Sequence, residues 1–164
     1  SLEFDSARLC NPDLTPEHES WREQVRRFLQ CEVEPYAETW DEAGAMPAEL
    51  WPKAAAMGLI GLGYPEQFGG TREGIDIWYK NILNEELARL GVGGVSANLM
   101  VHNIALPPVV NFARDPLRQD VATAVINGSQ RISLCVTEPG AGSDVAQLAS
   151  SERLDDDHYV VNGS

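Results

Sequence analysis

The chain has 164 residues, of which 43% are apolar and 23% are charged. This composition is typical of a soluble globular protein and excludes a disordered chain. Twelve basic residues stand against 25 acidic ones, and the formal net charge of -13 excludes sequence-independent binding to nucleic acid or anionic lipid. No window approaches the roughly 18 apolar residues of a membrane span.

The cysteines Cys10, Cys31 and Cys135 are widely spaced, with no C-x-x-C pair and no histidine cluster near them. They predict neither a disulfide framework nor a zinc site, so we expect no bound metal. The first residues also lack the apolar run of a secretory signal, which favours a cytoplasmic protein.

A helix is predicted over residues 15–30. Thr15 is a good N-cap, and Pro16 stands at the first helical position, where proline is favoured. Apolar residues recur at helical spacing and should face inward: Trp21, Val25, Phe28 and Leu29.

Shorter helices are predicted over 35–41 and 47–57. Residues 58–74 are too rich in glycine for a regular element and predict a structured loop, in which Tyr64 and Phe68 are expected to pack.

The clearest helical pattern covers 75–90, before Gly91. Its apolar stripe contains Trp78, Ile82, Leu83, Leu87 and Leu90. A further helix is predicted over 96–106, which the two prolines at 107–108 should close, and another over 116–126.

The pattern changes after the helices. Residues 131–137 and 159–161 are short β-prone runs. A domain boundary is therefore predicted near Gly128, with an all-α domain over 1–128 and the beginning of a β-domain over 129–164. Because so few strands are marginal in water, this second domain is expected to be incomplete.

Thr137 to Asp144 combine a strand end with a turn that contains two glycines, a hydroxyl and an acid. Such turns present backbone N–H groups to an anion, and a pyrophosphate would suit this one. An ordinary β-turn capped by a side chain explains the same residues, and the residues alone favour it.

The full string Cys135–Asp144, which reads CVTEPGAGSD, resembles the flavin-binding signature of the acyl-CoA dehydrogenases. Three further segments occur in the order that this family shows: 65–70 (PEQFGG), 85–89 (EELAR) and 159–164 (YVVNGS). The resemblance covers nearly the whole chain from about Leu14 onward.

The resemblance implies a mainly α fold. An N-terminal all-α helical bundle domain would be followed by the first strands of a truncated, β-barrel-like middle domain. In this family, a C-terminal helical bundle completes the active site.

The resemblance also implies FAD as the cofactor. Val136 and Thr137 would lie beside the isoalloxazine ring, the two glycines would let the backbone approach the phosphates, and Ser143 would lie near the pyrophosphate or the acyl-CoA. Leu99 and Met100 are core residues that would also line the acyl pocket. The implied cofactor-binding residues are Leu134, Cys135, Val136, Thr137, Gly140, Gly142 and Ser143.

Other polar residues near these segments receive structural interpretations. Glu138 is expected to be a structural charge in the turn, and Asp144 a cap of the local turn. His102 is expected to be a hydrogen-bonded structural residue, and Cys135 to be buried.

The implied reaction is α,β-dehydrogenation of an acyl-CoA thioester in fatty acid metabolism, with hydride transfer to flavin N5. The family's base is a glutamate expected beyond Ser164, so no catalytic residue is assigned and the chain is expected to be inactive alone. The implied acceptor is an electron-transferring flavoprotein. The implied assembly is a homotetramer or homodimer, in the mitochondrial matrix if the source is eukaryotic.

Two alternatives remain open at this point. An acyl-CoA oxidase, or a related flavin oxidase or monooxygenase, would keep the fold but let the reduced flavin react with O₂. A catalytically silent helical interaction module would bind no cofactor.

Overall fold

The computed structural model describes residues 11–163, which form two compact units, one up to Ser133 and one from Leu134. The first unit is helical and the second contains a β-hairpin. The predicted fold class is therefore confirmed. The predicted domain boundary near Gly128 stays a prediction. Cys10 lies outside the described residues.

Helix α1 (Pro16–Glu32) begins as predicted. Thr15 is its N-cap, and its hydroxyl accepts the His18 N–H while the His18 ring accepts the Thr15 N–H, which closes a capping box. Val25 and Leu29 are buried, and Phe28 is half-buried against the same core. The apolar face read from the sequence is thus the buried face.

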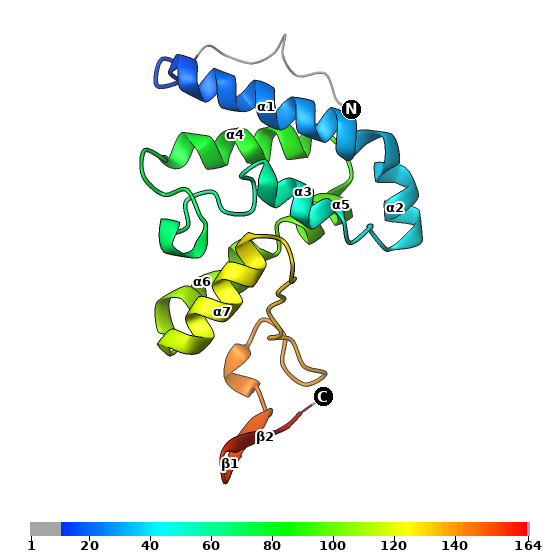
Figure 1. Ribbon diagram of the computed structural model, residues 1–164. Coiled ribbons are helices and arrows are strands. Elements are labelled where there is room, and N and C mark those ends of the chain that lie inside the picture. The colour runs from blue at the N-terminus through cyan, green and yellow to red at the C-terminus, as the bar shows by residue number, and fades with distance from the viewer. Residues whose placement is uncertain (1–10, 164) are drawn as a thin grey trace. The chain divides into compact units, whose positions relative to one another are not determined.

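Helix α4 (Ile77–Ala88) lies beside α1 (Figure 1). Its N-cap is Asp76, whose carboxylate accepts the Trp78 N–H at 2.9 Å. The other ring nitrogen of His18 lies 3.0 Å from the same carboxylate. One histidine therefore links the caps of the two helices. The predicted stripe of α4 is largely confirmed, because Ile82, Leu83 and Leu87 are buried.

The α1–α4 interface also contains a buried carboxylate. Glu86 is 3% exposed and accepts hydrogen bonds from Arg26 at 2.8 Å and from Arg22 at 3.1 Å. Burial raises the pKa of Glu86, but the hydrogen bonds from Arg26 and Arg22 outweigh it and leave that pKa below its ordinary value. Glu86 belongs to the segment 85–89, so the structure gives that segment a role in joining the helices.

Between these helices lie a 3-10 turn η2 (Glu34–Tyr36), α2 (Ala37–Ala43) and α3 (Leu50–Ala56). The sequence placed helices over 35–41 and 47–57, so their existence is confirmed and their ends shift by a few residues.

The glycine-rich segment 58–74 is a structured loop, as predicted, with a short 3-10 turn η3 (Glu66–Phe68) and a bridge between Leu62 and Thr71. Gly70 is required by close packing, because a Cβ there would lie 2.3 Å from the Tyr64 carbonyl oxygen. Tyr64 and Phe68 are buried, which confirms that they pack.

The predicted helix over 96–106 is wrong. Two helices replace it, α5 (Gly93–Leu99) and α6 (His102–Phe112), and Pro107 and Pro108 lie inside α6 instead of closing a helix. The break falls at Met100 and Val101. A proline lacks the N–H that would bond to the carbonyl four residues earlier. Here those carbonyls belong to residues 103 and 104, which are exposed.

Helix α7 (Asp115–Ile126) was predicted one residue shorter, and it pairs with α6 (Figure 1). The two helices and the loop share a second hydrophobic cluster, separate from the one under α1 and α4. Its buried members are Tyr64, Phe68, Leu106, Ala122, Val125 and Ile126.

In the second unit, β1 (Ser151–Asp155) and β2 (His158–Asn162) form an antiparallel hairpin, with Arg153 opposite Val160. The prediction of a strand at 159–161 is confirmed, while β1 was missed. The strand predicted over 131–137 is wrong, because no described segment pairs with it and a strand needs such a partner.

Candidate functional site

The segment from Thr137 to Ser150 forms a closed loop. The Glu138 N–H donates to the Ala141 carbonyl at 2.9 Å, and the Ala141 N–H donates back at 3.1 Å, which makes a tight turn around Pro139 and Gly140. Ala141 is 3% exposed, so this turn is anchored on its inner side.

The Glu138 carboxylate closes the loop at its far end. It accepts the N–H groups of Ala149 at 2.8 Å and of Ser150 at 2.9 Å. Hydrogen bonds from the Ser150 side chain and from these two backbone groups hold the pKa of Glu138 below its ordinary value. This is the structural role that the sequence suggested for Glu138.

Asp144 caps the short 3-10 turn η4 (Val145–Gln147), as expected. Its carboxylate accepts the Ala146 N–H at 3.3 Å and the Gln147 side-chain amide at 2.8 Å. Ser143, just before this cap, is exposed. The Ser143 side chain is therefore accessible at the surface of the second unit.

Gly140 and Gly142 are unlike the loop glycines of the helical unit. Neither has a positive φ, and a Cβ built at either would find no atom within 4 Å. Gly70 and Gly128, in contrast, would clash with backbone atoms if they had a side chain. Nothing in the described chain therefore requires glycine at 140 or 142, whereas a ligand approaching the backbone would require it.

Residues 134–137, before the turn, are extended and have no strand partner among the described residues. Leu134 is 50% exposed, Val136 is half-buried and Thr137 is exposed. Cys135 is exposed, so the expectation that it is buried is wrong. It was based on the usual burial of cysteine in a sheet, and no sheet forms here. The segment therefore exposes apolar surface, a hydroxyl and backbone groups that no described strand pairs.

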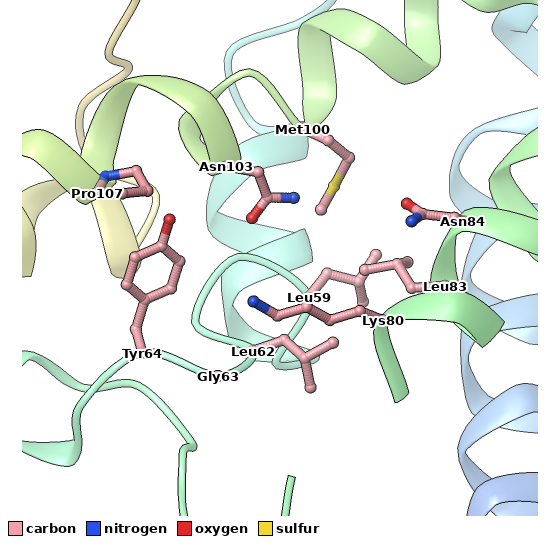
Figure 2. A pocket seen from close by; sticks show the side chains of 10 residues that line it. All are labelled: Leu59, Leu62, Gly63, Tyr64, Lys80, Leu83, Asn84, Met100, Asn103 and Pro107. Atoms are coloured by element: carbon pink, nitrogen blue, oxygen red, sulfur yellow. The ribbon is translucent and has the colours of Figure 1, made fainter. Parts of the chain in front are cut away.

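A pocket of about 290 Å³ lies within the helical unit (Figure 2). The loop, α4 and the start of α6 surround it, and Met100 lines it from the α5–α6 junction. Leu99, the other predicted substrate-binding residue, is fully buried in the core and is not among the lining residues. The lining residues are Leu59, Leu62, Gly63, Tyr64, Lys80, Leu83, Asn84, Met100, Asn103 and Pro107.

His102 lies behind the pocket and is 3% exposed. Burial lowers its pKa to about 4, although the backbone carbonyls of Leu99 and Ile60 act in the opposite direction. Its Nε2 has no hydrogen-bond partner, while its carbonyl accepts the Tyr64 hydroxyl at 3.2 Å. The ring is buried, as expected of a structural histidine, but the expected hydrogen bond is absent at Nε2.

Sequence reasoning missed Lys80 and Asn84 as pocket residues. They are one helical turn apart on α4, on the side where the buried Leu83 also lines the pocket, and no role was predicted for them. The only available signal was their i, i+4 spacing beside the glycine loop.

Two searches of residues 11–163 gave no candidates. No group of three or more His, Cys, Asp or Glu residues in this range could hold a metal ion. No helix in the same range is long and apolar enough to cross a membrane.

Comparison with known proteins connects the chain to one family. The family model described as "Acyl-CoA dehydrogenase, N-terminal domain" matches residues 15–129. The long-chain specific acyl-CoA dehydrogenase of Sus scrofa mitochondria is 33% identical over 148 residues, which are 90% of this chain and 34% of that protein. The chain thus spans about a third of the length of this relative.

Solved structures agree. A putative acyl-CoA dehydrogenase from Mycobacterium smegmatis is 41% identical with a TM-score of 0.83, covering 92% of this chain and 39% of its own. An acyl-CoA dehydrogenase from Bacillus anthracis, complexed with FAD, is 28% identical with a TM-score of 0.82, and the match covers 94% of this chain and 27% of that one. The helical bundle and the following hairpin define the front part of a flavoprotein dehydrogenase fold. The chain belongs to the acyl-CoA dehydrogenase family.

Proposed function

We propose that this chain is the N-terminal helical domain and the beginning of the middle β-domain of an FAD-dependent acyl-CoA dehydrogenase. The proposal rests mainly on Gly140 and Gly142, which have no side chain although the described chain leaves room for one. An approaching pyrophosphate explains that choice, because only glycine lets backbone N–H groups reach phosphate oxygens closely.

The neighbouring residues suit the other end of the cofactor. Leu134, Cys135 and Val136 would lie along the isoalloxazine ring, and the Thr137 hydroxyl would donate a hydrogen bond near N5. Ser143 would contact the pyrophosphate or the acyl-CoA. When bound, FAD supplies the hydride acceptor, and the protein's part is to orient it and tune its electronics.

The acyl group is proposed to end in the pocket at the α5–α6 junction, where Met100 contributes to the wall. No carboxylate is among the residues that line this pocket. The resemblance implies a glutamate base beyond Ser164, and we assign no catalytic residue within residues 11–163. The chain alone is expected to be inactive. We expect the C-terminal part of the enzyme to complete the active site and to form the contacts of a homotetramer or homodimer.

The proposed physiological acceptor is an electron-transferring flavoprotein, and the proposed location is the cytoplasm, or the mitochondrial matrix in a eukaryote. An acyl-CoA oxidase is the alternative with the same fold. Reoxidation separates them, because a dehydrogenase holds its reduced flavin stable in air far longer than an oxidase does.

The direct test uses the full-length protein that carries this chain. It should purify yellow, with one FAD per subunit, and an acyl-CoA should bleach the flavin under anaerobic conditions. A colourless protein that takes up no added FAD would contradict the proposal and favour an interaction module. Thr137→Val should slow flavin reduction while the unfolding temperature stays unchanged. Equal reduction rates in the two proteins would remove Thr137 from the site.

A further inference from the structure

Apolar and polar side chains both line the pocket in Figure 2. The apolar ones are Leu59, Leu62, Leu83 and Met100. The Lys80 ammonium points toward the part of the pocket that holds the Tyr64 hydroxyl and the Asn103 amide, which we call the polar side, while the Asn84 amide lies across the pocket beside Leu83 and Met100. A pocket of this kind suits a ligand that has an apolar chain and one polar end.

Lys80 gives the polar side a positive charge that nothing described neutralises. The chain has two lysines, and the other, Lys53, forms an ion pair with Glu32 at 2.6 Å. Among residues 11–163 no ion pair of Lys80 is found, and no acid lines the pocket. Asp76, one turn earlier on the same helix face, is engaged by His18. Lys80 is exposed, so its ammonium is accessible to a ligand.

The position of the ammonium is supported by the loop beneath it. Gly63 has a φ of +80°, and a Cβ there would lie 3.0 Å from the Lys80 Cε and 3.2 Å from its Nζ. The lysine stem therefore lies across the glycine, and any side chain at position 63 would displace it. Figure 2 shows the Lys80 stem running along the pocket, with its Nζ pointing to the side where Tyr64 and Asn103 lie.

We propose that Lys80, assisted by Asn103 and Tyr64, recognises a carboxylate at the distal end of the acyl chain, so that the enzyme prefers ω-carboxyacyl-CoA thioesters. The proposal rests on the proposed function, because it assumes that the acyl group enters this pocket. A lysine, an amide and a hydroxyl can satisfy the oxygens of one carboxylate, and hydrogen bonds between charged partners are about twice as strong as neutral ones. A methyl end would leave these groups without a partner.

The test compares pairs of thioesters of equal length, such as adipyl-CoA with hexanoyl-CoA and suberyl-CoA with octanoyl-CoA, on the full-length holoenzyme. We expect kcat/KM to be at least tenfold higher for the carboxylate-ended member of one pair. Lys80→Met should remove most of that preference through a higher KM for the carboxylate-ended substrate. The ratio of kcat/KM for the two members of the pair is the readout, and its expected fall of about tenfold corresponds to about 1.4 kcal/mol of lost interaction.

Two control variants separate charge recognition from damage to the fold. Lys80→Arg should retain most of the preference because it keeps a cation at the site. Lys53→Met removes the other lysine, far from this pocket, and should leave both substrates unaffected. Added salt should raise KM more for the carboxylate-ended thioester than for the methyl-ended one, because the charges of the CoA phosphates are common to both.

The possible failures are distinguishable. If no thioester bleaches the flavin, the proposed function fails. If methyl-ended thioesters bleach it and carboxylate-ended ones show no advantage, or if Lys80→Met changes both members of a pair equally, the enzyme proposal stands and the carboxylate site is refuted.

Discussion

At the scale of single residues, the buried polar groups of this chain have different physical tasks. Glu86 is buried as an anion because two arginines of α1 donate to it. His102 is buried as a neutral ring, and its Nε2 finds no partner. The first arrangement ties two helices together, while the second makes the helical unit sensitive to acid.

The His102 pKa gives a prediction for stability against pH. The pKa of His102 is about 4 in the folded chain, against an ordinary value of 6.5. Between pH 4 and 6.5 the unfolded chain therefore binds a proton at this histidine, while the folded chain does not. The stabilisation is present above about pH 6.5 and is lost as the pH falls toward 4. The shift corresponds to about 3 kcal/mol at most.

Urea unfolding at pH 7.0, 5.5 and 4.5 measures this effect. His102→Gln should unfold more easily at pH 7 but should lose less stability than the wild type between pH 7 and 4.5. His158→Gln, at an exposed position of the hairpin, is the matched control for the substitution itself. Parallel pH curves for the wild type and His102→Gln would show that another group governs the acid response.

Glu138 controls the shape of the proposed flavin loop. Glu138→Gln keeps the size of the side chain but directs an amide N–H toward one of two backbone N–H groups that now donate to the carboxylate. We expect faster hydrogen exchange at Ala149 and Ser150 and several-fold weaker FAD binding in the full-length protein. Glu152→Gln, on the exposed hairpin, should change neither.

The same loop should withstand moderate acid. Because the folded pKa of Glu138 is lowered, its contribution is present above the ordinary carboxyl value and is lost only as the pH falls through the lower folded value. The N–H groups of Ala149 and Ser150 should therefore stay protected from hydrogen exchange at pH 5. Loss of protection already at pH 6 would contradict this assignment of the charge.

At the scale of elements, local rules predicted what local contacts decide. Thr15, Pro16 and the spacing of Trp21, Val25 and Leu29 act within one helix, so α1 was predicted almost to its ends. The role of His18 was not predictable, because its second partner, Asp76, is 58 residues away in sequence. The proposed role of Gly140 and Gly142 was predicted from a sequence motif. The place of Lys80 in the pocket was not predictable, because only the fold brings Lys80 to the glycine-rich segment 58–74.

Tertiary packing overruled the local rules in two other places. The residues 131–137 have strand propensity, but propensity forms no strand without a neighbour. Helix α6 tolerates its two prolines because the residues whose carbonyls they leave unpaired are exposed. On the opposite side of the helix, Ala105 and Leu106 are buried in the core. Packing of that buried side supplies more than the two missing hydrogen bonds cost.

This explanation of α6 predicts a gain from Pro108→Ala. The new N–H can donate to the Ile104 carbonyl, and alanine favours the helix interior, so the unit should be stabilised by up to about 3 kcal/mol. Thermal unfolding of the purified protein measures the change. Pro116→Ala, at the first turn of α7, is the control and should bring no gain, because proline suits that position. A lower melting temperature for Pro108→Ala would mean that the ring itself is needed.

At the scale of the whole molecule, stability and the proposed cofactor chemistry belong to different units. Both hydrophobic clusters are built from residues no later than Ile132. The hairpin of the second unit is almost entirely exposed, and an isolated two-stranded hairpin is marginal in water. The helical unit should therefore fold independently of the residues that we assign to FAD.

A chain that stops after Ser133 tests this division. We expect it to retain the helical circular dichroism and one cooperative urea transition, with a midpoint close to that of residues 1–164. If the midpoint collapses, or if the helices melt without cooperativity, residues 134–164 support the helical core after all. The same shortened chain, compared with 1–164 by calorimetry, should lose any measurable heat of FAD binding. Such a loss in a chain that is still folded would assign the cofactor contact to the glycine loop, since a loss caused by unfolding would appear in the circular dichroism as well.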